Sequence, residues 1–306
     1  MRFLLFFFLC FNAVKIQAQE LYSKAYGEIQ NPAIIFIHGG PSGNANLFEG
    51  TTAKLLADKG FYVIVYDRRG EGRSKDEMAT MTFEESFKDL LQIYRQYDLK
   101  KASLLAHSFG GIIATLFTEK YPEKVENLVL AGALFSQQET YDYICTQANL
   151  FYKENALKRN ELIDIAKLDK HTAEYRKKCF AIASELKLFD MPNPTTESIG
   201  LRSAFEKSDF FKSSFRNQES PLKFFAHEKR SNTNTKTELK RIVAQNLPVI
   251  GIYGEDDGIF SKKQLQELRE MIGQNHLEII PNCSHFLFVD QQEVFLNILV
   301  KKMKTM

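Results

Sequence analysis

The sequence contains no tryptophan, only four cysteines, and no long apolar run beyond its first residues. Aromatic bulk comes instead from 26 Phe and 12 Tyr. No group of cysteine and histidine residues has the spacing of a zinc site, so we expect no metal. Internal repeats and low-complexity stretches are also missing. These absences argue against zinc modules and repeat architectures, and they favour a globular domain.

The chain also lacks an excess of either charge. Its 40 basic residues face 38 acidic ones, which gives a net charge of +2. No basic field marks a surface for nucleic acid or anionic lipid, so we expect neither as a partner. The 306 residues are 44% hydrophobic and 25% charged. This is enough chain for one large α/β domain with an insertion.

Residues 1–18 have the composition of a signal peptide. Arg2 provides the positive start, residues 3–11 form an apolar run, and Ala18 is a small residue before a cleavage point at Gln19. The run is too short to span a bilayer permanently. We therefore expect export to the periplasm or extracellular space, with no stable membrane span. The alternative for this segment is a buried first strand.

Export would leave three cysteines, Cys145, Cys179 and Cys283. Three thiols allow at most one disulfide within the chain, so at least one thiol stays free. The sequence does not identify the partners of such a disulfide.

Short apolar runs alternate with amphipathic segments along much of the chain. We expect buried strands at residues 33–37, 61–66, 103–106, 127–131, 248–252 and 276–280. We expect helices at residues 51–59, 82–97, 109–120 and 293–302, the second of them opened by a capping box of Thr82 and Glu85. The alternation predicts the α/β class, with a mostly parallel sheet and helices on both faces.

The alternation stops between residues 134 and 240. This segment is charged, rich in Phe and Tyr, and mostly helical in its spacing. Since it separates two strands of the sheet, we expect a helical cap that lies over the strand ends and roofs the site formed there. The predicted organisation is a signal peptide at 1–18, a core at 19–133 and 241–306, and a helical cap at 134–240.

The stretch at residues 101–114 joins a buried strand to a helix through a sharp turn. Ser108 stands at the turn, with Ala106 two residues before it and Gly110 two residues after it. A serine there is held in a strained backbone conformation, with its hydroxyl above the sheet and room only for small neighbours. Glycine is usual at the first position, and Ala106 still meets the steric requirement. The alternative is an ordinary turn with a chance serine.

Other polar residues follow predicted strands. The run His38-Gly39-Gly40-Pro41 leaves backbone amides free to face a developing negative oxygen. Further on, Asp256 and Asp257 follow one strand, and His285 follows the last. A serine nucleophile needs a histidine base, and the histidine needs a carboxylate to fix its tautomer. The chain order Ser, Asp, His fits a site of this kind on a parallel sheet.

These motifs together resemble the α/β-hydrolase family over nearly the whole length after residue 18. The matching pieces are residues 38–41, Asp-Arg-Arg-Gly-Glu-Gly-Arg-Ser at 67–74, residues 106–110, Gly-Glu-Asp-Asp at 254–257, and His285. The resemblance implies an α/β-hydrolase sheet and a cofactor-free catalytic triad. In the family the acid stands three residues after the glycine, which selects Asp257. The triad is then Ser108, His285 and Asp257.

The same resemblance implies that the backbone amides of Gly40 and Phe109 form the oxyanion hole. It also implies a structural role for the 67–74 loop, in which we expect Asp67 to pair with Arg69. Two alternatives stay open for the triad. Asp256 is the acid if Asp257 serves only as a helix N-cap, and His285 is an ordinary loop histidine if the serine is not a nucleophile.

Within the family, residues 38–41 and 67–74 are similar to the proline iminopeptidase branch, whose members remove N-terminal residues from short peptides. Phe109 departs from the tryptophan usual in that branch, and Pro-Ser-Gly at 41–43 departs from its Pro-Gly. A peptidase needs cap carboxylates to hold the ammonium of its substrate. The available residues are Glu139, Glu154, Glu197 and Glu206.

The resemblance therefore implies an exported serine hydrolase that acts on a small ester, amide or N-terminal peptide bond. Its substrate is a small molecule or short peptide, and its type is a proline iminopeptidase-like peptidase or a carboxylesterase. The alternative from another functional class is a non-catalytic protein that binds a small ligand on the same fold.

Overall fold

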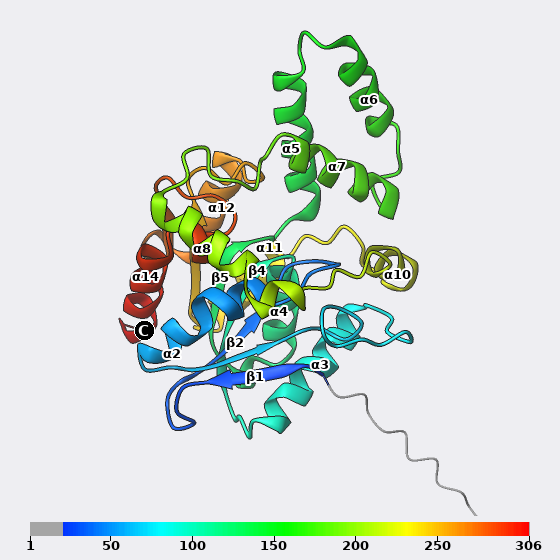
Figure 1. The fold of residues 1–306 in the computed structure, drawn as a ribbon. Helices are drawn as coiled ribbons and strands as arrows, with labels where there is room; N and C mark the ends of the chain where they lie inside the picture. Colours follow the sequence, from blue (N-terminus) through cyan, green and yellow to red (C-terminus); the bar gives the residue numbers. More distant parts are fainter. Residues whose placement is uncertain (1–20, 306) are drawn as a thin grey trace, which may run out of the picture.

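A seven-stranded sheet in the order β1-β3-β2-β4-β5-β6-β7 forms the centre of the computed structural model, which describes residues 21–305 (Figure 1). The strands are β1 (Ser23–Tyr26), β2 (Ala33–Ile37), β3 (Tyr62–Tyr66), β4 (Ala102–Ser108), β5 (Val125–Ala133), β6 (Val249–Gly254) and β7 (Leu277–Ile280). All neighbouring pairs are parallel except β1 with β3. The predicted α/β class with a mostly parallel sheet is confirmed. The predicted signal peptide at residues 1–18 lies outside the described residues.

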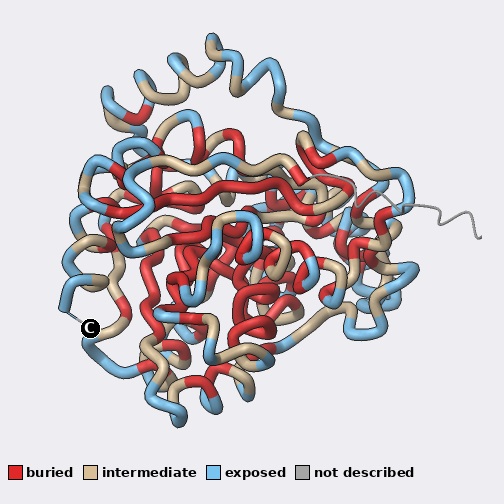
Figure 2. The backbone as a smooth tube through the Cα atoms, turned by 90° about the horizontal axis from the view of Figure 1, so that it is seen from below, coloured by how far each residue is buried: buried red, intermediate tan, exposed pale blue. Residues whose placement is uncertain are grey.

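Apolar cores lie on both faces of the sheet, as Figure 2 shows by the red, buried tube at its centre. Successive residues of a strand point to opposite faces, so in β2 Ile35 and Ile37 join one core and Ile34 and Phe36 the other. The first core is covered by α3 (Phe83–Gln96), α4 (Gly110–Lys120), α11 (Lys236–Ala244) and α12 (Lys262–Ile272). The second is covered by α1 (Asn46–Phe48), a π-helical turn at Glu49–Ala53, α2 (Lys54–Asp58), α13 (Leu287–Asp290) and α14 (Gln292–Thr305).

Several predicted boundaries differ from the observed ones. The helix predicted at residues 51–59 is divided between the π-helical turn and the short α2. His276 belongs to a 3-10 turn at Gln274–His276, and a second such turn lies at Pro122–Lys124. Thr82 caps α3 by accepting from the Glu85 amide, but the Glu85 carboxylate bonds the amides of Thr80 and Met81. The predicted capping box is therefore only half formed.

The segment between β5 and β6 is helical, as predicted. It contains α5 (Gln137–Phe151), α6 (Ala156–Ala166), α7 (Ala173–Glu185), α8 (Thr196–Glu206), α9 (Asp209–Lys212) and α10 (Ser220–His227). Helices α5, α6 and α7 project from the rest of the molecule at the top of Figure 1. Helix α11 crosses the predicted boundary at residue 240 and packs against α4 and α12. The division into a core and a cap stays a prediction.

No helix within residues 21–305 is long and apolar enough to cross a membrane.

Candidate active site

Ser108 occupies a strained turn between the end of β4 and the start of α4. Its φ is +53°, in the left-handed region that residues with a Cβ seldom adopt. Close packing explains the small residues around it: a Cβ at Gly110 would lie 2.4 Å from the Ile37 carbonyl oxygen, and one at Gly39 would lie 2.9 Å from the Ser108 Cβ. Ser108 is 8% exposed, and its hydroxyl has no hydrogen-bond partner among the described residues. The side chain is therefore presented at a fixed place with its oxygen free.

His285 and Asp257 meet at the same edge of the sheet. The Nδ1 of His285 lies 2.9 Å from the Oδ2 of Asp257, and both residues are buried. The other carboxylate oxygen of Asp257 accepts from the Ile259 amide at 3.3 Å. Asp256, the alternative acid, is more exposed and is not in contact with the histidine. This arrangement fixes the His285 ring with Nδ1–H toward the carboxylate and leaves Nε2 unbonded within residues 21–305.

Two other histidines near Ser108 have structural partners. The Nε2–H of His107 donates to the His285 carbonyl at 2.9 Å. Burial, and after it the neighbouring His285, lower the pKa of His107 to about 3, so its ring is neutral. His38 donates from Nδ1 to the Gly39 carbonyl at 2.7 Å and accepts the Arg68 amide on Nε2 at 3.1 Å. Burial also holds the pKa of His38 well below its usual value. Both side chains are therefore committed to the surrounding loops.

The loop that contains Gly40 is held from behind by a buried ion pair. Arg68 contacts Glu71 at 2.7 Å and donates to the carbonyl oxygens of His38 and Gly39, the latter at 2.8 Å. Glu71 in turn accepts the backbone amides of Ser42 and Gly43. These contacts fix the loop, and the amides of Ser42 and Gly43 are bound to Glu71. Phe109 stands at the N-cap of α4, where helix amides have no intrahelical partner.

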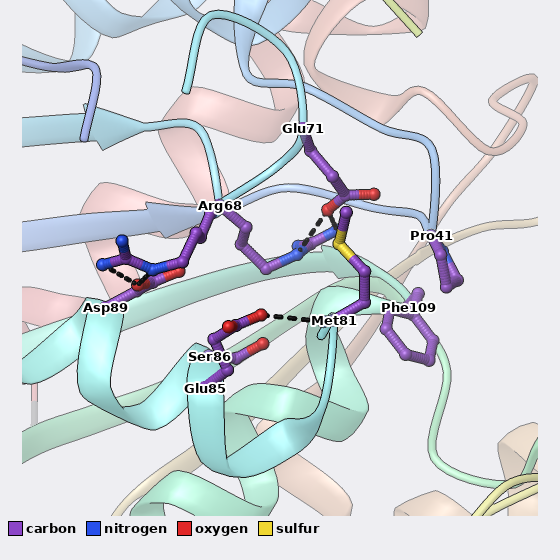
Figure 3. Close-up of a pocket in the computed structure, with 9 residues that line it drawn as sticks. Pro41, Arg68, Glu71, Met81, Glu85, Ser86, Asp89 and Phe109 are labelled. Carbon is purple, nitrogen blue, oxygen red and sulfur yellow. Dashed lines mark hydrogen bonds and ion pairs between the residues drawn. The ribbon is translucent and has the colours of Figure 1, made fainter. Parts of the chain in front are cut away.

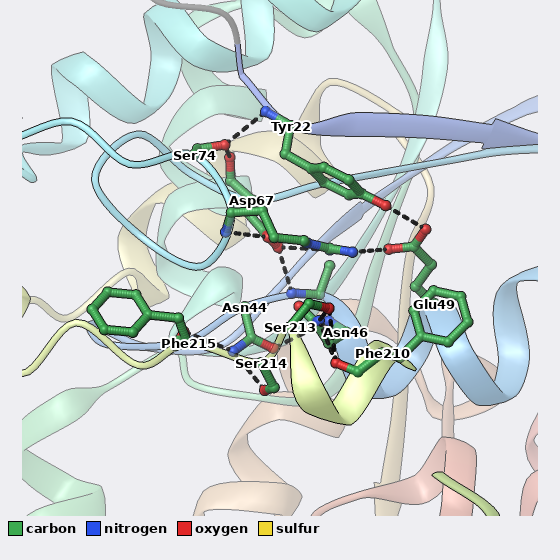
Figure 4. A network of polar contacts seen from close by, with 12 residues as sticks. Tyr22, Asn44, Asn46, Glu49, Asp67, Ser74, Phe210, Ser213, Ser214 and Phe215 are labelled. Carbon is green, nitrogen blue, oxygen red and sulfur yellow. Dashed lines mark hydrogen bonds and ion pairs between the residues drawn. The ribbon is translucent and has the colours of Figure 1, made fainter. Parts of the chain in front are cut away.

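The 67–74 loop is structural, but its ion pairs differ from the prediction. Asp67 pairs with Arg73 at 2.6 Å and also accepts the Ala45 amide at 2.7 Å (Figure 4). Arg69 pairs with Asp89 at 3.1 Å instead of with Asp67. The predicted Asp67–Arg69 pair is therefore wrong. The loop supports the chain that leads from the Gly40 loop into α1.

A small void lies behind this loop, bordered by Pro41, Arg68, Glu71, Met81 and Phe109 (Figure 3). Its volume is about 10 Å³, which is the space of about one water molecule. No substrate of the predicted kinds fits there.

The chain after α7 is anchored to both loops that carry the His285–Asp257 pair. The Gly258 amide donates to the Leu188 carbonyl at 2.9 Å, and the Ser284 hydroxyl donates to the Phe189 carbonyl at 2.7 Å. The Phe189 ring centroid lies 5.2 Å from that of His285. Residues 188–189 thus form one wall of the candidate site.

Two further contacts bring the helical segment to the candidate oxyanion residues. Arg176 of α7 donates to the carbonyl oxygen of Gly40 at 3.1 Å. Phe224 of α10 packs edge-on against Phe109, with the ring centroids 5.3 Å apart. A surface groove of about 710 Å³ runs between the end of α7 and α8, and Asp190 and Arg202 contribute to its walls. It is large enough for a small ligand, but none of the residues of the candidate triad lines it.

Of the four carboxylates considered for a substrate ammonium, only Glu206 lines the groove between the end of α7 and α8. Glu139 is paired with Lys236 at 2.5 Å, and Glu154, Glu197 and Glu206 are exposed. The residues of the helical segment that do contact the site, Arg176 and Phe189, were missed. Arg176 carried a signal: it shares the buried face of α7 with Tyr175 and Cys179, where an arginine is unusual. Nothing in the sequence distinguished Phe189.

No group of three or more His, Cys, Asp or Glu side chains able to hold a metal ion occurs within residues 21–305. The described residues around Ser108 form a buried Asp–His pair and a strained serine, beside a loop held in place by the Arg68–Glu71 pair. This set is suited to acyl transfer through a serine.

Comparison with known proteins agrees with this fold. A sequence profile described as alpha/beta hydrolase fold matches residues 32–292. The proline iminopeptidase of Saccharolobus solfataricus is 24% identical over 96% of this chain and 95% of its own length. The crystal structure of a Mycobacterium smegmatis proline iminopeptidase superposes with a TM-score of 0.67 at 17% identity, covering 94% of this chain and 96% of the other.

A structure reported with carboxylesterases of Nitrososphaera gargenis has a TM-score of 0.63 at 18% identity, and it covers 94% of this chain and 96% of the other. At such identities the two solved structures show a shared fold. The profile match is the wider evidence, because it extends from the strand β2 to the start of α14 and includes Ser108, Asp257 and His285. The chain therefore belongs to the α/β-hydrolase fold family, and within that family it resembles the proline iminopeptidases.

Proposed function

We propose that this protein is a serine hydrolase in which Ser108, His285 and Asp257 form the catalytic triad. The family and its peptidase and esterase relatives support hydrolase activity. The observation that carries the finer proposal is the 2.9 Å contact between His285 and Asp257, at the same edge of the sheet as a serine held at φ +53°. A carboxylate in that position keeps the histidine in the tautomer that accepts a proton on Nε2.

The proposed reaction begins when the Ser108 hydroxyl attacks the substrate carbonyl carbon while its proton passes to His285 Nε2. The tetrahedral intermediate collapses as His285 gives this proton to the leaving alcohol or amine, which leaves an acyl-serine ester. Water then attacks the ester, again with His285 as base, and releases the acid and free Ser108. Asp257 stays ionised and stabilises the imidazolium formed in each step.

The backbone amides of Gly40 and Phe109 are proposed to bind the oxyanion of both intermediates. Phe109 lies at the N-terminus of α4, where the helix dipole adds positive potential. The Arg68–Glu71 pair holds the Gly40 loop before substrate arrives, so little reorganisation is needed during the reaction. Loss of one such donor typically costs about 100- to 1,000-fold in kcat.

The proposed substrate is a small ester, an amide or the N-terminal peptide bond of a short peptide. The Phe189 ring beside His285 and the Phe224 ring packed against Phe109 support this class, because small-molecule sites are mainly apolar with a few placed polar groups. The proposed cap, residues 134–240, would supply these walls. We also propose export to the periplasm or extracellular space, from the composition of residues 1–18.

Substrate profiling tests this function. Purified protein would be assayed with 4-nitrophenyl esters of increasing acyl length and with aminoacyl-4-nitroanilides, including the prolyl compound. We expect turnover in at least one series, and a loss of at least about 1,000-fold in kcat for Ser108→Ala with the fold retained. Substantial activity in the variant would place the nucleophile elsewhere. No turnover by the natural sequence in either series would favour the non-catalytic ligand-binding alternative.

A further inference from the structure

Arg176 lies beside the candidate oxyanion loop without an acidic partner. It is 7% exposed, and its Nη2 donates to the carbonyl oxygens of Gly40 at 3.1 Å and Pro41 at 3.4 Å. No carboxylate among residues 21–305 comes within 4.0 Å of its guanidinium nitrogens. Carbonyl oxygens are dipoles and offset only part of the cost of burying a full positive charge.

Buried and half-buried arginines on the other side of the Gly40 loop are paired with carboxylates. Arg68 contacts Glu71 at 2.7 Å, and Arg73 contacts Asp67 at 2.6 Å. Arg69, which is less buried, contacts Asp89 at 3.1 Å. Arg176 therefore differs from these arginines, because no carboxylate among residues 21–305 neutralises its positive charge. A buried cation with no counter-charge in the protein is suited to an anion supplied from outside.

The surroundings of Arg176 contain a second buried polar group. The Tyr141 hydroxyl of α5 is buried and accepts or donates no hydrogen bond within the described residues. Burial raises the pKa of Tyr141, and interactions with the side chains of Arg176 and Gln137 oppose that effect. A neutral phenol beside a guanidinium provides two donors for one carboxylate.

A row of aromatic rings leads from Arg176 toward the triad. The guanidinium carbon lies 4.6 Å from the Phe180 ring centroid, and Phe180 stacks on Phe189 at 5.7 Å. Phe189 then contacts His285 at 5.2 Å. Both phenylalanines are only partly buried. The row can therefore border the body of a bound molecule whose charged end lies at Arg176.

We propose that Arg176 is a substrate-recognition residue that binds a carboxylate of the substrate. The inference rests on the proposed function and narrows its substrate class to small esters, amides or short peptides that carry a free carboxylate near the bond that is cleaved. The planar guanidinium matches a carboxylate in two parallel hydrogen bonds, which an ammonium group cannot do. The site then selects for an anionic end of the substrate and not for an ammonium group.

Matched substrate pairs test this inference. Mono-4-nitrophenyl esters of dicarboxylic acids with four to six carbons would each be compared with the corresponding methyl ester, after correction for spontaneous hydrolysis. A dipeptide and its C-terminal amide form a second pair. For the natural sequence we expect kcat/KM to be at least about 10-fold higher for the acid of the preferred length. Equal rates on acid and methyl ester for every length and for the dipeptide pair would overturn the inference without any variant.

Variants then separate recognition from structure. Arg176→Gln should lower kcat/KM for the acid by about 10- to 100-fold and change the methyl ester by less than about threefold. Arg176→Lys should keep part of the preference, because it retains the charge but not the planar fork. Lys177→Gln removes an exposed charge from the same helix and should leave the ratio unchanged.

The outcomes discriminate between the two proposals. If Arg176→Gln lowers acid and methyl ester alike, Arg176 only holds the helical segment on the Gly40 loop, and the inference is wrong while the serine hydrolase stands. If the natural sequence turns over neither member of any pair and Ser108 does not react with a fluorophosphonate, the proposed function fails and this inference fails with it.

Discussion

At the scale of single residues, the proposed triad depends on which acid orients His285. Asp257 is buried against His285, whereas Asp256 is more exposed and uses its backbone amide to bond the Cys283 carbonyl. Of these two adjacent residues in the loop after β6, only Asp257 is therefore placed to orient His285.

Two amide substitutions test this assignment. Asp257→Asn should lower kcat by about 1,000- to 10,000-fold, because an asparagine no longer enforces the Nδ1–H tautomer of His285. Asp256→Asn removes one carboxylate charge from the neighbouring residue, and it should alter kcat by less than about threefold. Steady-state kinetics on the best substrate would measure both. The opposite ranking would show that the acid is Asp256.

Some residues of the candidate site could be predicted from the sequence, and others could not. Ser108, Asp257 and His285 could be assigned together because each follows a strand, and the carboxyl ends of parallel strands meet at one edge of the sheet. Arg176 and Phe189 could not be assigned in this way. Arg176 reaches a carbonyl 136 positions earlier in the chain, and Phe189 is held by a serine 95 positions later. Contacts of such separation depend on how a helical insertion folds back.

At the scale of elements, the sequence predicts helices and strands that have a strong apolar pattern, and it does not predict those with a weak one. Strand β2 was predicted with its observed bounds because residues 33–37 are all apolar and buried on both faces. Strand β1 was missed because Ser-Lys-Ala-Tyr at the edge of the sheet is short and only half buried. The π-helical turn at Glu49–Ala53 has no sequence signal that separates it from an α-helix.

Helices α5 and α7 contain a pair of neighbouring thiols, which bears on the single disulfide that the sequence allows. Cys145 and Cys179 are unbonded, with their sulfurs 3.9 Å apart, and Cys283 is buried elsewhere against its own loop. The neighbouring Cys179 thiol lowers the pKa of Cys145, which is also the more accessible of the two. Cys145 is therefore the thiol that should react first with an oxidant.

Oxidised glutathione should convert this pair into one disulfide. The Cys145 thiolate attacks the glutathione disulfide and releases one glutathione, and the Cys179 thiolate then displaces the second glutathione from the mixed disulfide. For protein that lacks residues 1–18, and therefore Cys10, we expect one free thiol per chain by thiol titration and a peptide map that joins Cys145 to Cys179. For a separation of 34 positions the bond should stabilise the fold by about 3–4 kcal/mol. A bond to Cys283, or three free thiols after oxidation, would contradict the prediction; Cys283→Ser is the control that should oxidise normally.

At the scale of the whole molecule, buried neutral histidines predict how stability depends on pH. His107 stays unprotonated in the fold down to about pH 3, whereas an unfolded histidine binds its proton near pH 6.5. Below pH 6.5 the unfolded state therefore binds more protons, so the free energy of unfolding falls as pH falls. One such group contributes a slope of up to about 1.4 kcal/mol per pH unit between about pH 6 and 3.5.

Removing this histidine should make the pH dependence shallower. His107→Gln is expected to reduce the slope of the unfolding free energy against pH by about 1.4 kcal/mol per unit in that range, measured by urea unfolding at several pH values. His171→Gln, at an exposed position of the helical segment, reports any effect of the substitution itself. An unchanged slope for His107→Gln would mean that this ring is protonated in the folded protein at the same pH as in the unfolded chain.

The central claim is that Ser108 is an activated nucleophile, and covalent labelling tests it most directly. Folded protein would be treated with a fluorophosphonate, and the modified residue would be located by peptide mass spectrometry. We expect phosphonylation of Ser108 alone, abolished in Ser108→Ala and strongly slowed in Asp257→Asn, because the label requires the histidine base and the oxyanion amides. Folded protein that takes up no label, or that is labelled at another serine, would contradict the account.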